Sequence, residues 1–414
     1  MTTTWSGSYT FGARTVHRPT STDELAEIVA GARRVRALGS RHSFNDLADS
    51  PGDLVLLDGL PGDVVVDDEA RTVTAPAGLR YGALARELDA RGWALHAMAS
   101  LPHISLAGGV ATATHGSGNH ARNLAAAVAG LEIVGADGSI RGLTRQDEEL
   151  AGSVVGLGAL GVVTRVTFDI EPTYQVAQTV DLDLPWDAAL DHVSEIMASA
   201  DSVSLFTDWS GPAVQQVWRK ARVRDGSRAA ELERFGARPA TTPRHPIAGL
   251  DTAACTEQLG VPGPWHERLP HFRLDFTPSS GEELQSEYLL PREHAAEALA
   301  AVRALSASVT PLLLVSEVRT IAADDLWLST ASGGDAVALH FTWKQLPTEV
   351  AAVLPTIEDA LAPFGARPHW GKVFADRDRA LARLYPRMDG FRALVARRDP
   401  EGKFSNAFLE RHVL

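Results

Sequence analysis

Residues 36–44 read Arg36-Ala37-Leu38-Gly39-Ser40-Arg41-His42-Ser43-Phe44, a short apolar strand that runs into a tight polar turn. Gly39 can adopt backbone angles that are closed to other residues, so the chain can approach a phosphate closely there. The hydroxyls of Ser40 and Ser43 lie beside backbone N–H groups, and together they favour an anion-binding concavity. His42 can act as a nucleophile toward an electrophilic carbon of a cofactor. Alone, the segment is also compatible with an ordinary surface loop.

A second stretch, residues 99–118, is almost free of charge and dense in hydroxyls, glycines and small apolar residues. It reads Ala99-Ser100-Leu101-Pro102-His103-Ile104-Ser105-Leu106-Ala107-Gly108-Gly109-Val110-Ala111-Thr112-Ala113-Thr114-His115-Gly116-Ser117-Gly118. Such a composition suits a backbone that wraps around a large ligand, although it is also compatible with small-residue packing. A zinc site formed by His103, His115 and His120 is a further alternative, but neither a cysteine nor an HExxH pattern supports it.

The segment Gly156-Leu157-Gly158-Ala159-Leu160-Gly161 matches the dinucleotide-binding fingerprint. That fingerprint requires a helix directly after it, because the pyrophosphate rests on the helix N-terminus. The run Val162–Phe168 is instead rich in β-branched residues and predicts a strand. We therefore reject a nicotinamide-binding Rossmann domain and assign these glycines to a close backbone approach, either to a neighbouring strand or to a cofactor ring.

Composition narrows the class of protein. The chain has 414 residues, 45% of them apolar, which is enough for two or three domains with ordinary cores. Its formal net charge of −13 argues against binding to nucleic acid or to an anionic membrane, and favours a small-molecule substrate. The single cysteine, Cys255, excludes an internal disulfide and a thiolate metal cluster. Because neither a signal segment nor a membrane-spanning window is evident, we expect a cytoplasmic protein, and a monomer without a metal.

Hydrophobic periodicity predicts an α+β fold. Strand and helix signals alternate up to about residue 175, and longer strands with fewer helices follow, as in a domain built on an antiparallel sheet. We read residues 223–249 as a long surface excursion. The predicted strands are 35–38, 54–57, 64–66, 72–74, 131–134, 139–143, 162–170, 174–184, 203–209, 214–220, 284–290, 312–320 and 336–343, and the predicted helices are 22–33, 81–91, 291–306, 348–362 and 380–397.

Two charged residues lie in an otherwise apolar predicted strand. Glu317 and Arg319 are two apart, so the strand presents both on one face, and the same holds for His340 and Thr342 in the next strand. An unpaired charge buried there costs about 3 to 5 kcal/mol. The two residues are therefore either paired with each other or face a polar ligand.

Together these segments resemble the vanillyl-alcohol oxidase flavoprotein superfamily, which has the PCMH-type FAD fold, and within it the alditol oxidases. The resemblance covers almost the whole chain and includes blocks more specific than any glycine loop: 204–209, 256–258, 263–273, 285–288, 368–372 and 402–404. It implies a PCMH-type FAD-binding domain with two α/β subdomains at 1–175. A substrate-binding cap domain on a mixed or antiparallel sheet flanked by helices would follow at 176–374, and a C-terminal segment at 375–414 would return to the FAD domain.

The same resemblance implies FAD attached through its 8α carbon to His42, with neighbouring residues along the cofactor. Those residues are Ala37, Leu38, Gly39, Ser40, Arg41 and Ser43 at the pyrophosphate, Ser100, Ser105, Gly108, Thr112, Ala113, Thr114 and His115 farther along, and Val162 near the adenine. One position departs from the family pattern, because Arg41 stands where glycine is expected. A positive φ would strain an arginine there, whereas its guanidinium could pair with the pyrophosphate.

For the substrate, the resemblance implies contacts from Ser100, Glu317, Arg319, Thr342 and Lys372, with Gln285 and His340 farther out. Glu317, Arg319 and Lys372 would serve catalysis, the two cations holding the hydroxyl at C1 of an alditol such as xylitol, sorbitol or glycerol. The expected reaction is hydride transfer to flavin N5, giving an aldose, with O₂ reduced to H₂O₂. Neutral Lys372 or a water is the expected proton acceptor. The alternatives are an aldonolactone oxidase, a dye- or quinone-linked sugar-alcohol dehydrogenase, and a non-catalytic polyol-binding protein.

Overall fold

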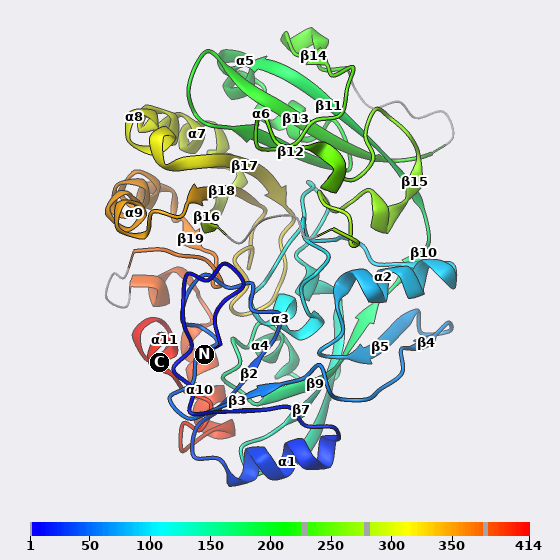
Figure 1. Ribbon diagram of the computed structural model, residues 1–414, viewed down its shortest axis with the longest axis vertical. Helices are drawn as coiled ribbons and strands as arrows, with labels where there is room; N and C mark the ends of the chain where they lie inside the picture. The colour runs from blue at the N-terminus through cyan, green and yellow to red at the C-terminus, as the bar shows by residue number, and fades with distance from the viewer. Residues whose placement is uncertain (1, 225–230, 277–281, 376–379) are drawn as a thin grey trace.

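Two large antiparallel sheets organise the protein, one in each half of Figure 1. The computed structural model describes residues 2–224, 231–276, 282–375 and 380–414. The lower half contains the N-terminal residues and the C-terminal helices, and the upper half contains the middle of the chain. We call the large upper sheet the cap sheet. The expected α+β class is confirmed.

The lower half is built on a five-stranded sheet in the order β4-β5-β9-β7-β8 within the described residues. Alternate residues of β9 are buried, as expected for a strand with one face on a core. β7 and β8 form a hairpin whose turn contains Gly138 at φ +84°. The strands are β4 (Val65–Asp67), β5 (Thr72–Pro76), β7 (Val128–Val134), β8 (Ile140–Thr144) and β9 (Val162–Asp169).

A small parallel sheet, β1-β3-β2, lies beside this sheet and delivers the chain to the first loop. Its strands are β1 (Thr15–His17), β2 (Val35–Leu38) and β3 (Asp53–Leu56). Helix α1 (Thr22–Gly31) begins where the Ser21 side chain accepts a hydrogen bond from the Glu24 N–H. Three further helices belong to this half: α2 (Tyr81–Ala90), α3 (Leu106–Ala111) and α4 (Leu150–Ser153). The two-residue strands β6 (Trp93–Ala94) and β10 (Glu171–Pro172) pair with each other.

The cap sheet has nine strands among the described residues, in the order β14-β11-β13-β12-β17-β18-β16-β19, with β15 on β11. Its strands are β11 (Gln175–Pro185), β12 (Ser202–Thr207), β13 (Ala213–Arg222), β14 (Arg238–Pro239), β15 (Gly263–Pro264), β16 (Glu283–Pro291), β17 (Leu313–Ile321), β18 (Ala336–Lys344) and β19 (Arg367–Pro368). The strand pairs in this sheet are antiparallel, as predicted.

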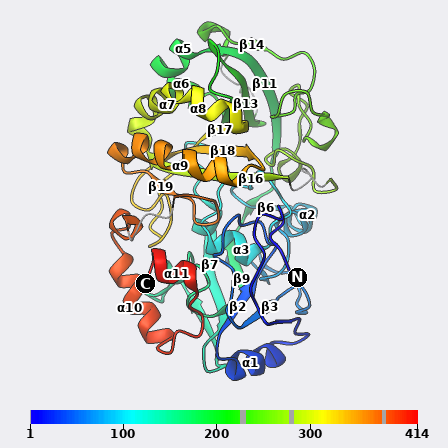
Figure 2. The ribbon, with the colours of Figure 1, turned by 60° about the vertical axis from the view of Figure 1, so that its left-hand side comes forward.

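The two faces of the cap sheet differ in chemistry. Leu284, Tyr288, Phe341 and Trp343 pack in the cap's apolar core with the helices, whereas the other face of β16, β17 and β18 carries most of the polar side chains: Gln285, Glu287, Glu317, Arg319, His340 and Thr342. The helices gather on one side of the sheet in Figures 1 and 2. They are α5 (Trp186–Asp191), α6 (Val193–Met197), α7 (Ala295–Ala304), α8 (Ser306–Val309) and α9 (Pro347–Leu361). The polar face is therefore left toward the lower half.

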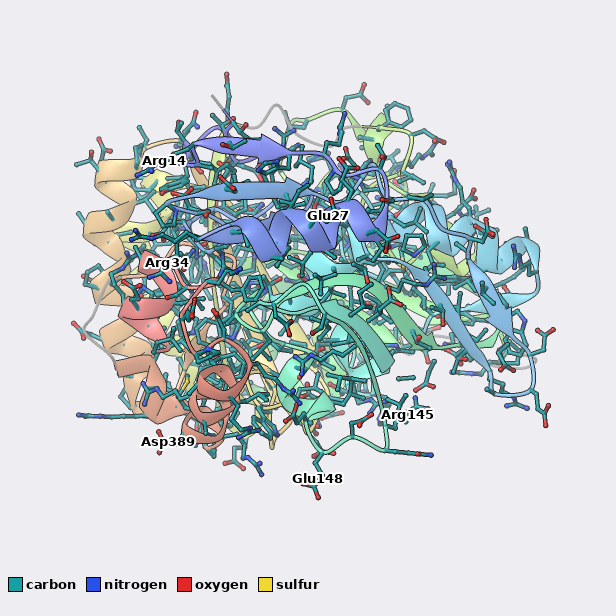
Figure 3. The ribbon with its side chains drawn as sticks, turned by 90° about the horizontal axis from the view of Figure 1, so that it is seen from below. Arg14, Glu27, Arg34, Arg145, Glu148 and Asp389 are labelled. Atoms are coloured by element: carbon teal, nitrogen blue, oxygen red, sulfur yellow. The ribbon has the colours of Figure 1, made fainter. Side chains whose placement is uncertain are left out.

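The C-terminal segment returns to the lower half. Its predicted continuous helix at 380–397 is wrong: a 3₁₀ helix, Ala380–Leu384, is followed by α10 (Met388–Arg398) and then by an unpredicted α11 (Ala407–His412). Pro386 lies in the break, where proline cannot continue the hydrogen-bonding pattern. Figure 3 shows α1, the parallel sheet and the C-terminal helices on one face, with charged side chains such as Glu27 and Asp389 pointing outward.

The predicted surface excursion at 223–249 is partly wrong. Residues 225–230 lie outside the described residues. Beyond them, Leu232 and His245 are buried, and β14 pairs with the edge of β11. This segment therefore closes one end of the cap sheet. Among the described helices, none combines the length and apolar composition required to cross a bilayer.

Candidate active site

A cavity of about 580 Å³ lies between the polar face of the cap sheet and the loops of the lower half. Both glycine-rich stretches singled out in the sequence line it. From the site residues expected along the cofactor and substrate, it brings together Ala37, Leu38, Gly39, Ser40, Arg41, His42, Ser43, Ser100, Ser105, Gly108, Thr112, Thr114, His115, Gln285, Glu317, Arg319, His340, Thr342 and Lys372. Ala113 and Val162 are instead buried in the apolar cores beside it.

The two loops meet almost backbone to backbone. A Cβ atom added to Gly39 would come within 2.5 Å of Ser105 Oγ, and one added to Gly108 within 2.8 Å of the same atom. The Ser105 N–H donates to Ser40 Oγ over 3.2 Å. Only residues without a side chain allow this approach. Ser105 Oγ and His42 Nδ1 are buried without a hydrogen-bond partner in the described part of the chain, so two polar atoms remain available to a ligand.

The strain expected at residue 41 is present. Arg41 has φ +65°, in the left-handed region that favours glycine, and its side chain is exposed at the rim of the cavity. The Trp5 N–H donates to Arg41 O over 2.7 Å, and the Trp5 ring stacks on His42 with centroids 5.0 Å apart. The N-terminal segment therefore holds the loop in this conformation from outside.

Gly156, Gly158 and Gly161 also line the cavity, and strand β9 follows them directly. Rejection of the Rossmann interpretation is therefore confirmed. A Cβ on Gly161 would lie 2.5 Å from Val134 O on the neighbouring strand. Buried Arg36 ties this segment to distant ones, donating to Leu157 O over 2.6 Å, to Leu47 O over 2.8 Å and to Phe404 O.

Strand register gathers the polar side chains of the cap sheet into rows. Glu287 on β16 is opposite His340 on β18, which is opposite Glu317 on β17. Gln285 is likewise opposite Thr342. Directly opposed residues project from the same face of a sheet. Two carboxylates and a histidine therefore stand side by side on the cavity wall, and Arg319 follows two residues along.

Glu287 is the centre of this wall, and no role was predicted for it from the sequence. Its carboxylate accepts a hydrogen bond from Arg319 Nη2 at 2.5 Å and lies 3.3 Å from both His115 Nε2 and His340 Nδ1. Burial alone would raise the pKa of Glu287, but Arg319 and the histidines lower it well below its usual value. Its alternation with Gln285 along one strand is the signal that could have identified it.

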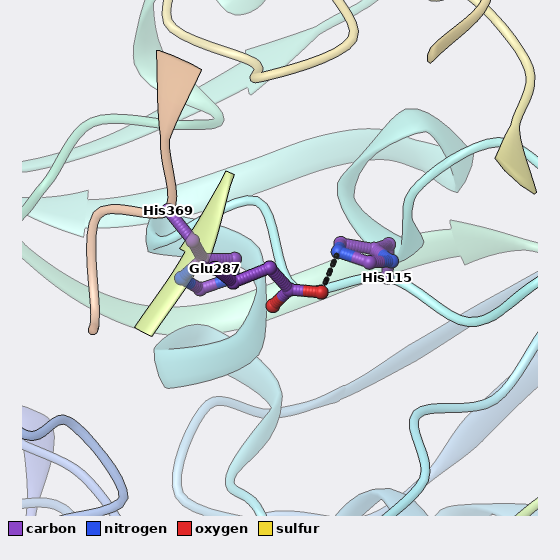
Figure 4. A group of neighbouring side chains, drawn as sticks. All are labelled: His115, Glu287 and His369. Carbon is purple, nitrogen blue, oxygen red and sulfur yellow. Dashed lines mark ion pairs between the residues drawn. The ribbon is translucent and has the colours of Figure 1, made fainter. Parts of the chain in front are cut away.

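Three potential metal ligands converge around Glu287: His115, Glu287 and His369 have ligand atoms within 4.8 Å of one another (Figure 4). Their hydrogen bonds argue against a metal. His369 Nδ1 accepts from the Gly371 N–H over 3.1 Å, so the proton of a neutral ring is on Nε2. Arg319 already neutralises Glu287. The predicted alternative of His103, His115 and His120 is not assembled, since His103 binds Leu274 O and His120 is exposed.

Glu317 and Arg319 are neighbours, with Glu317 Oε2 at 3.6 Å from Arg319 Nε, and both face the cavity. Pairing and a ligand-facing position were posed as alternatives, and both hold. Arg319 Nη1 donates to Ser100 Oγ over 3.3 Å. Glu317 Oε1 is 2.8 Å from Nε2 of His271, a residue of the block 263–273 for which no role was predicted. Arg319 and His271 lower the pKa of Glu317 well below its usual value, although burial opposes them.

Lys372 reaches the same wall from the turn after β19. Its ammonium group donates to Gln285 Oε1 and lies 4.9 Å from the centroid of the Phe44 ring. Burial lowers the pKa of Lys372 to about 8, despite the opposing effect of Glu287. Although burial also works against the charge of Arg319, the two carboxylates raise its pKa. The two cations therefore differ, since one can titrate near neutral pH and the other stays charged.

Comparisons with known proteins agree with this architecture. A family model described as "FAD binding domain" matches residues 13–144, and one described as "D-arabinono-1,4-lactone oxidase" matches residues 281–412. The chain is 51% identical over 411 residues to an alditol oxidase from Streptomyces sp. (strain IKD472 / FERM P-14339), covering 98% of this chain and 97% of the relative. It is 30% identical to an L-gulono-1,4-lactone dehydrogenase from Mycobacterium tuberculosis (strain ATCC 25618 / H37Rv), over 98% and 97% of the two chains.

Among solved structures, the fold is similar to that of cholesterol oxidase from B. sterolicum, with a TM-score of 0.79, 16% identity, and coverage of 100% of this chain and 96% of that one. Fold, cavity and family model together define an FAD-binding oxidoreductase of the vanillyl-alcohol oxidase superfamily. Identity along nearly the whole chain narrows this class, and the protein belongs to the alditol oxidase family. The expected superfamily and its FAD cofactor are confirmed.

Glu287→Gln tests the central position of that carboxylate. We expect a loss of about 3 kcal/mol in unfolding free energy, because removing one partner leaves the buried Arg319 charge poorly compensated. The matched control is Glu257→Gln, in an exposed pair at 3.5 Å from Arg273, for which we expect a change below about 0.5 kcal/mol. Urea unfolding followed by tryptophan fluorescence measures both. Equal losses of unfolding free energy in Glu287→Gln and Glu257→Gln would contradict the central role of Glu287 in the wall.

Proposed function

We propose that the protein is an alditol oxidase, which converts the C1 hydroxyl of a polyol such as xylitol or sorbitol to the aldehyde and reduces O₂ to H₂O₂. The observation that carries this proposal is the buried wall of hydrogen-bonding side chains on β16, β17 and β18, which faces the FAD cavity. A polyol has a hydroxyl on every carbon, so such a wall can bind each one. Buried donors and acceptors also reject substrates that leave them unpaired.

The cofactor end of the cavity fits FAD. In this proposal residues 1–175 and 375–414 hold FAD and residues 176–374 form the cap; of these, residues 1, 225–230, 277–281 and 376–379 lie outside the described residues. The Ala37–Ser43 loop, with Arg41, holds the pyrophosphate, because Gly39 and Gly108 leave the backbone open to close approach. Ser105, Thr112, Thr114 and His115 follow the cofactor, with Ala113 and Val162 supporting it from the cores. Bound FAD supplies the hydride acceptor and passes the electrons to O₂.

At the substrate end, Arg319 holds the reacting hydroxyl and stabilises the negative charge that develops on its oxygen. Glu317 Oε2 accepts from the hydroxyl at C2, since Oε1 is already bound by His271. Ser100 and Thr342 complete the contacts, and Gln285 and His340 meet hydroxyls farther along the chain. Glu287 keeps Arg319 oriented through their hydrogen bond.

Lys372 is the proton acceptor in this proposal. Its pKa of about 8 provides a useful neutral fraction at weakly alkaline pH, which suits a general base better than the strongly acidic Glu317. Gln285 accepts one hydrogen of the amine and fixes its position. Nζ can then take the proton of the C1 hydroxyl as hydride leaves the carbon.

Peroxide formation with different substrates tests the function. We expect turnover with xylitol and sorbitol, weaker turnover with glycerol, and little with L-gulono-1,4-lactone, because a lactone lacks the open chain of hydroxyls that the wall can bind. Activity on the lactone alone would favour a function like that of the mycobacterial relative, an L-gulono-1,4-lactone dehydrogenase. Turnover with a dye but not with O₂ would identify a dehydrogenase.

The tether to His42 is tested by acid precipitation. Burial first, and then Arg80 and Lys372, lower the pKa of His42 to about 4, which leaves its ring neutral and nucleophilic at pH 7. We expect flavin to stay with the precipitated wild-type protein and to be released from His42→Ala.

Arg41→Gly should keep the covalent yield, because the loop already has its positive φ with arginine in place. It should also raise the unfolding free energy by up to about 1 kcal/mol. Soluble flavin after precipitation of the wild type would exclude the tether.

The pH profile tests Lys372. Below pH 8 the amine is protonated and cannot accept a proton, so kcat/KM should rise about tenfold per pH unit and level off above pH 8. Lys372→Arg keeps a cation that does not titrate, and its lower rate should show no inflection near pH 8. A wild-type profile that falls above pH 8 would instead assign Lys372 the role of a cation.

A further inference from the structure

A chain of three buried side chains lies behind the substrate-facing carboxylate of Glu317. His271 Nε2 is 2.8 Å from Glu317 Oε1, and Lys220 Nζ is 3.0 Å from His271 Nδ1. Lys220 is 1% exposed and also donates to the carbonyl oxygens of Leu269, at 2.5 Å, and Pro270, at 2.9 Å. The reaction steps above give no role to Lys220 and use His271 only as the partner of Glu317 Oε1.

These contacts define which ring nitrogen of His271 carries the proton. An ionised carboxylate only accepts hydrogen bonds, so Nε2 must donate to Glu317. Nδ1 must then be an acceptor, and the ammonium group of Lys220 has three hydrogens for its three acceptors, which are Nδ1 and the carbonyl oxygens of Leu269 and Pro270. A second proton on the ring is disfavoured, since burial and then Lys220 lower the pKa of His271 to about 4. The chain therefore has one direction, from Lys220 through His271 to Glu317.

The position of the ring is fixed as firmly as its protonation. The edges of Phe206 and Trp218 meet His271 at centroid distances of 5.5 and 5.4 Å. The backbone N–H of His271 donates to Ser100 O over 3.1 Å, so the same residue also anchors a second substrate-contacting position. Aromatic packing and hydrogen bonds together leave the imidazole little freedom to turn.

The chain also separates two spaces. Ser100, His271 and Arg319 line both the main cavity and a second cavity of about 360 Å³, and Lys220 lines the second one. If the imidazole is lost, water from the second cavity can reach Glu317 Oε1. The carboxylate would then keep its charge but lose the fixed donor that orients it.

We propose that His271 and Lys220 are positioning residues that make the enzyme require a hydroxyl on the carbon next to the reacting one. By occupying Oε1, His271 leaves Glu317 Oε2 as the acceptor for that second hydroxyl. This inference rests on the proposed oxidation of polyols. It predicts that disturbing the chain weakens selection for the 1,2-diol unit more than it weakens oxidation itself.

Two amide variants at one position provide a matched test. In His271→Gln the side-chain nitrogen can occupy the place of Nε2 and still donate to Glu317, whereas in His271→Asn the shorter side chain cannot reach it. Glycerol and 1,3-propanediol both have three carbons and differ only in the C2 hydroxyl. We expect the ratio of their kcat/KM values to fall at least about tenfold in His271→Asn and to stay within about threefold of wild type in His271→Gln.

Lys220→Met tests the far end of the chain and should lower the same ratio, because Nδ1 loses its donor and the ring can turn away from Glu317. Its control is Lys344→Met, an exposed lysine that donates to Pro311 O at 2.7 Å outside the cavity, which should behave as wild type. Flavin absorbance of each purified variant shows whether the cofactor site is intact, so a folding defect is distinguished from altered selection.

The outcomes separate the two proposals. If the wild type produces no peroxide from xylitol, the proposed function fails. If the wild type is active and His271→Asn, with normal flavin content, keeps the wild-type ratio, the positioning role is excluded. Equal loss of the ratio in His271→Gln and His271→Asn would also overturn it, because the donated hydrogen bond would then not be what matters.

Discussion

The buried ion pair between Glu287 and Arg319 is the interaction on which the arrangement of the site depends. Glu287 also contacts His340 on the neighbouring strand and His115 from the lower half, and its backbone oxygen accepts the N–H of His369. Glu287, through its carboxylate and its backbone oxygen, therefore joins three cap segments to the loop expected to follow the cofactor. Removing two opposite charges from water is costly unless each keeps several partners, which explains why this cluster is so densely bonded.

That requirement shapes the rest of the cap sheet. Arg319, buried between two carboxylates, stays charged. Burial instead lowers the pKa of Lys372 on the same wall to about 8, so this amine titrates near neutral pH. Burial lowers the pKa of His340 and of His369 on the same wall, which keeps these two rings neutral. The wall therefore combines a permanent cation, a titratable amine and neutral rings on adjacent strands. This division of roles is what a site needs to stabilise charge and accept a proton at once.

The loops at the cofactor end of the cavity differ in composition from the cap sheet. Its loops contribute backbone and small residues rather than charged side chains, and their conformation is held from a distance. Arg36 binds carbonyl oxygens from three other segments, including Phe404 near the C-terminus, and Trp5 covers the strained loop at Arg41. The glycines allow the two loops to approach each other closely, and these long-range contacts hold the loops in that conformation.

The sequence by itself determined much of this protein. Alternation on β17 placed Glu317 with Arg319, and alternation on β18 placed His340 with Thr342, since side chains two apart in a strand share a face. The β-branched run after Gly161 ruled out a Rossmann domain, and the glycine-rich loops together with the later blocks indicated FAD. The sequence also placed most strand limits within a few residues, because short apolar runs bounded by turn residues leave few alternatives. The predicted continuous helix at 380–397 was wrong, because Pro386 lacks the backbone N–H that a continuous helix needs at that position.

Only the tertiary structure decided how these pieces meet. Glu287 and His271 were visible in the chain, yet nothing local shows that Glu287 is opposite His340 on the neighbouring strand or that His271 reaches Glu317 from 46 positions away. Burial and partners distant in sequence decide how each carboxylate is paired. They also decide which histidine nitrogen donates a hydrogen bond and which of the two cations titrates near neutral pH. Periodicity specifies the face on which a side chain lies, whereas strand register and the packing of the two halves specify what it faces.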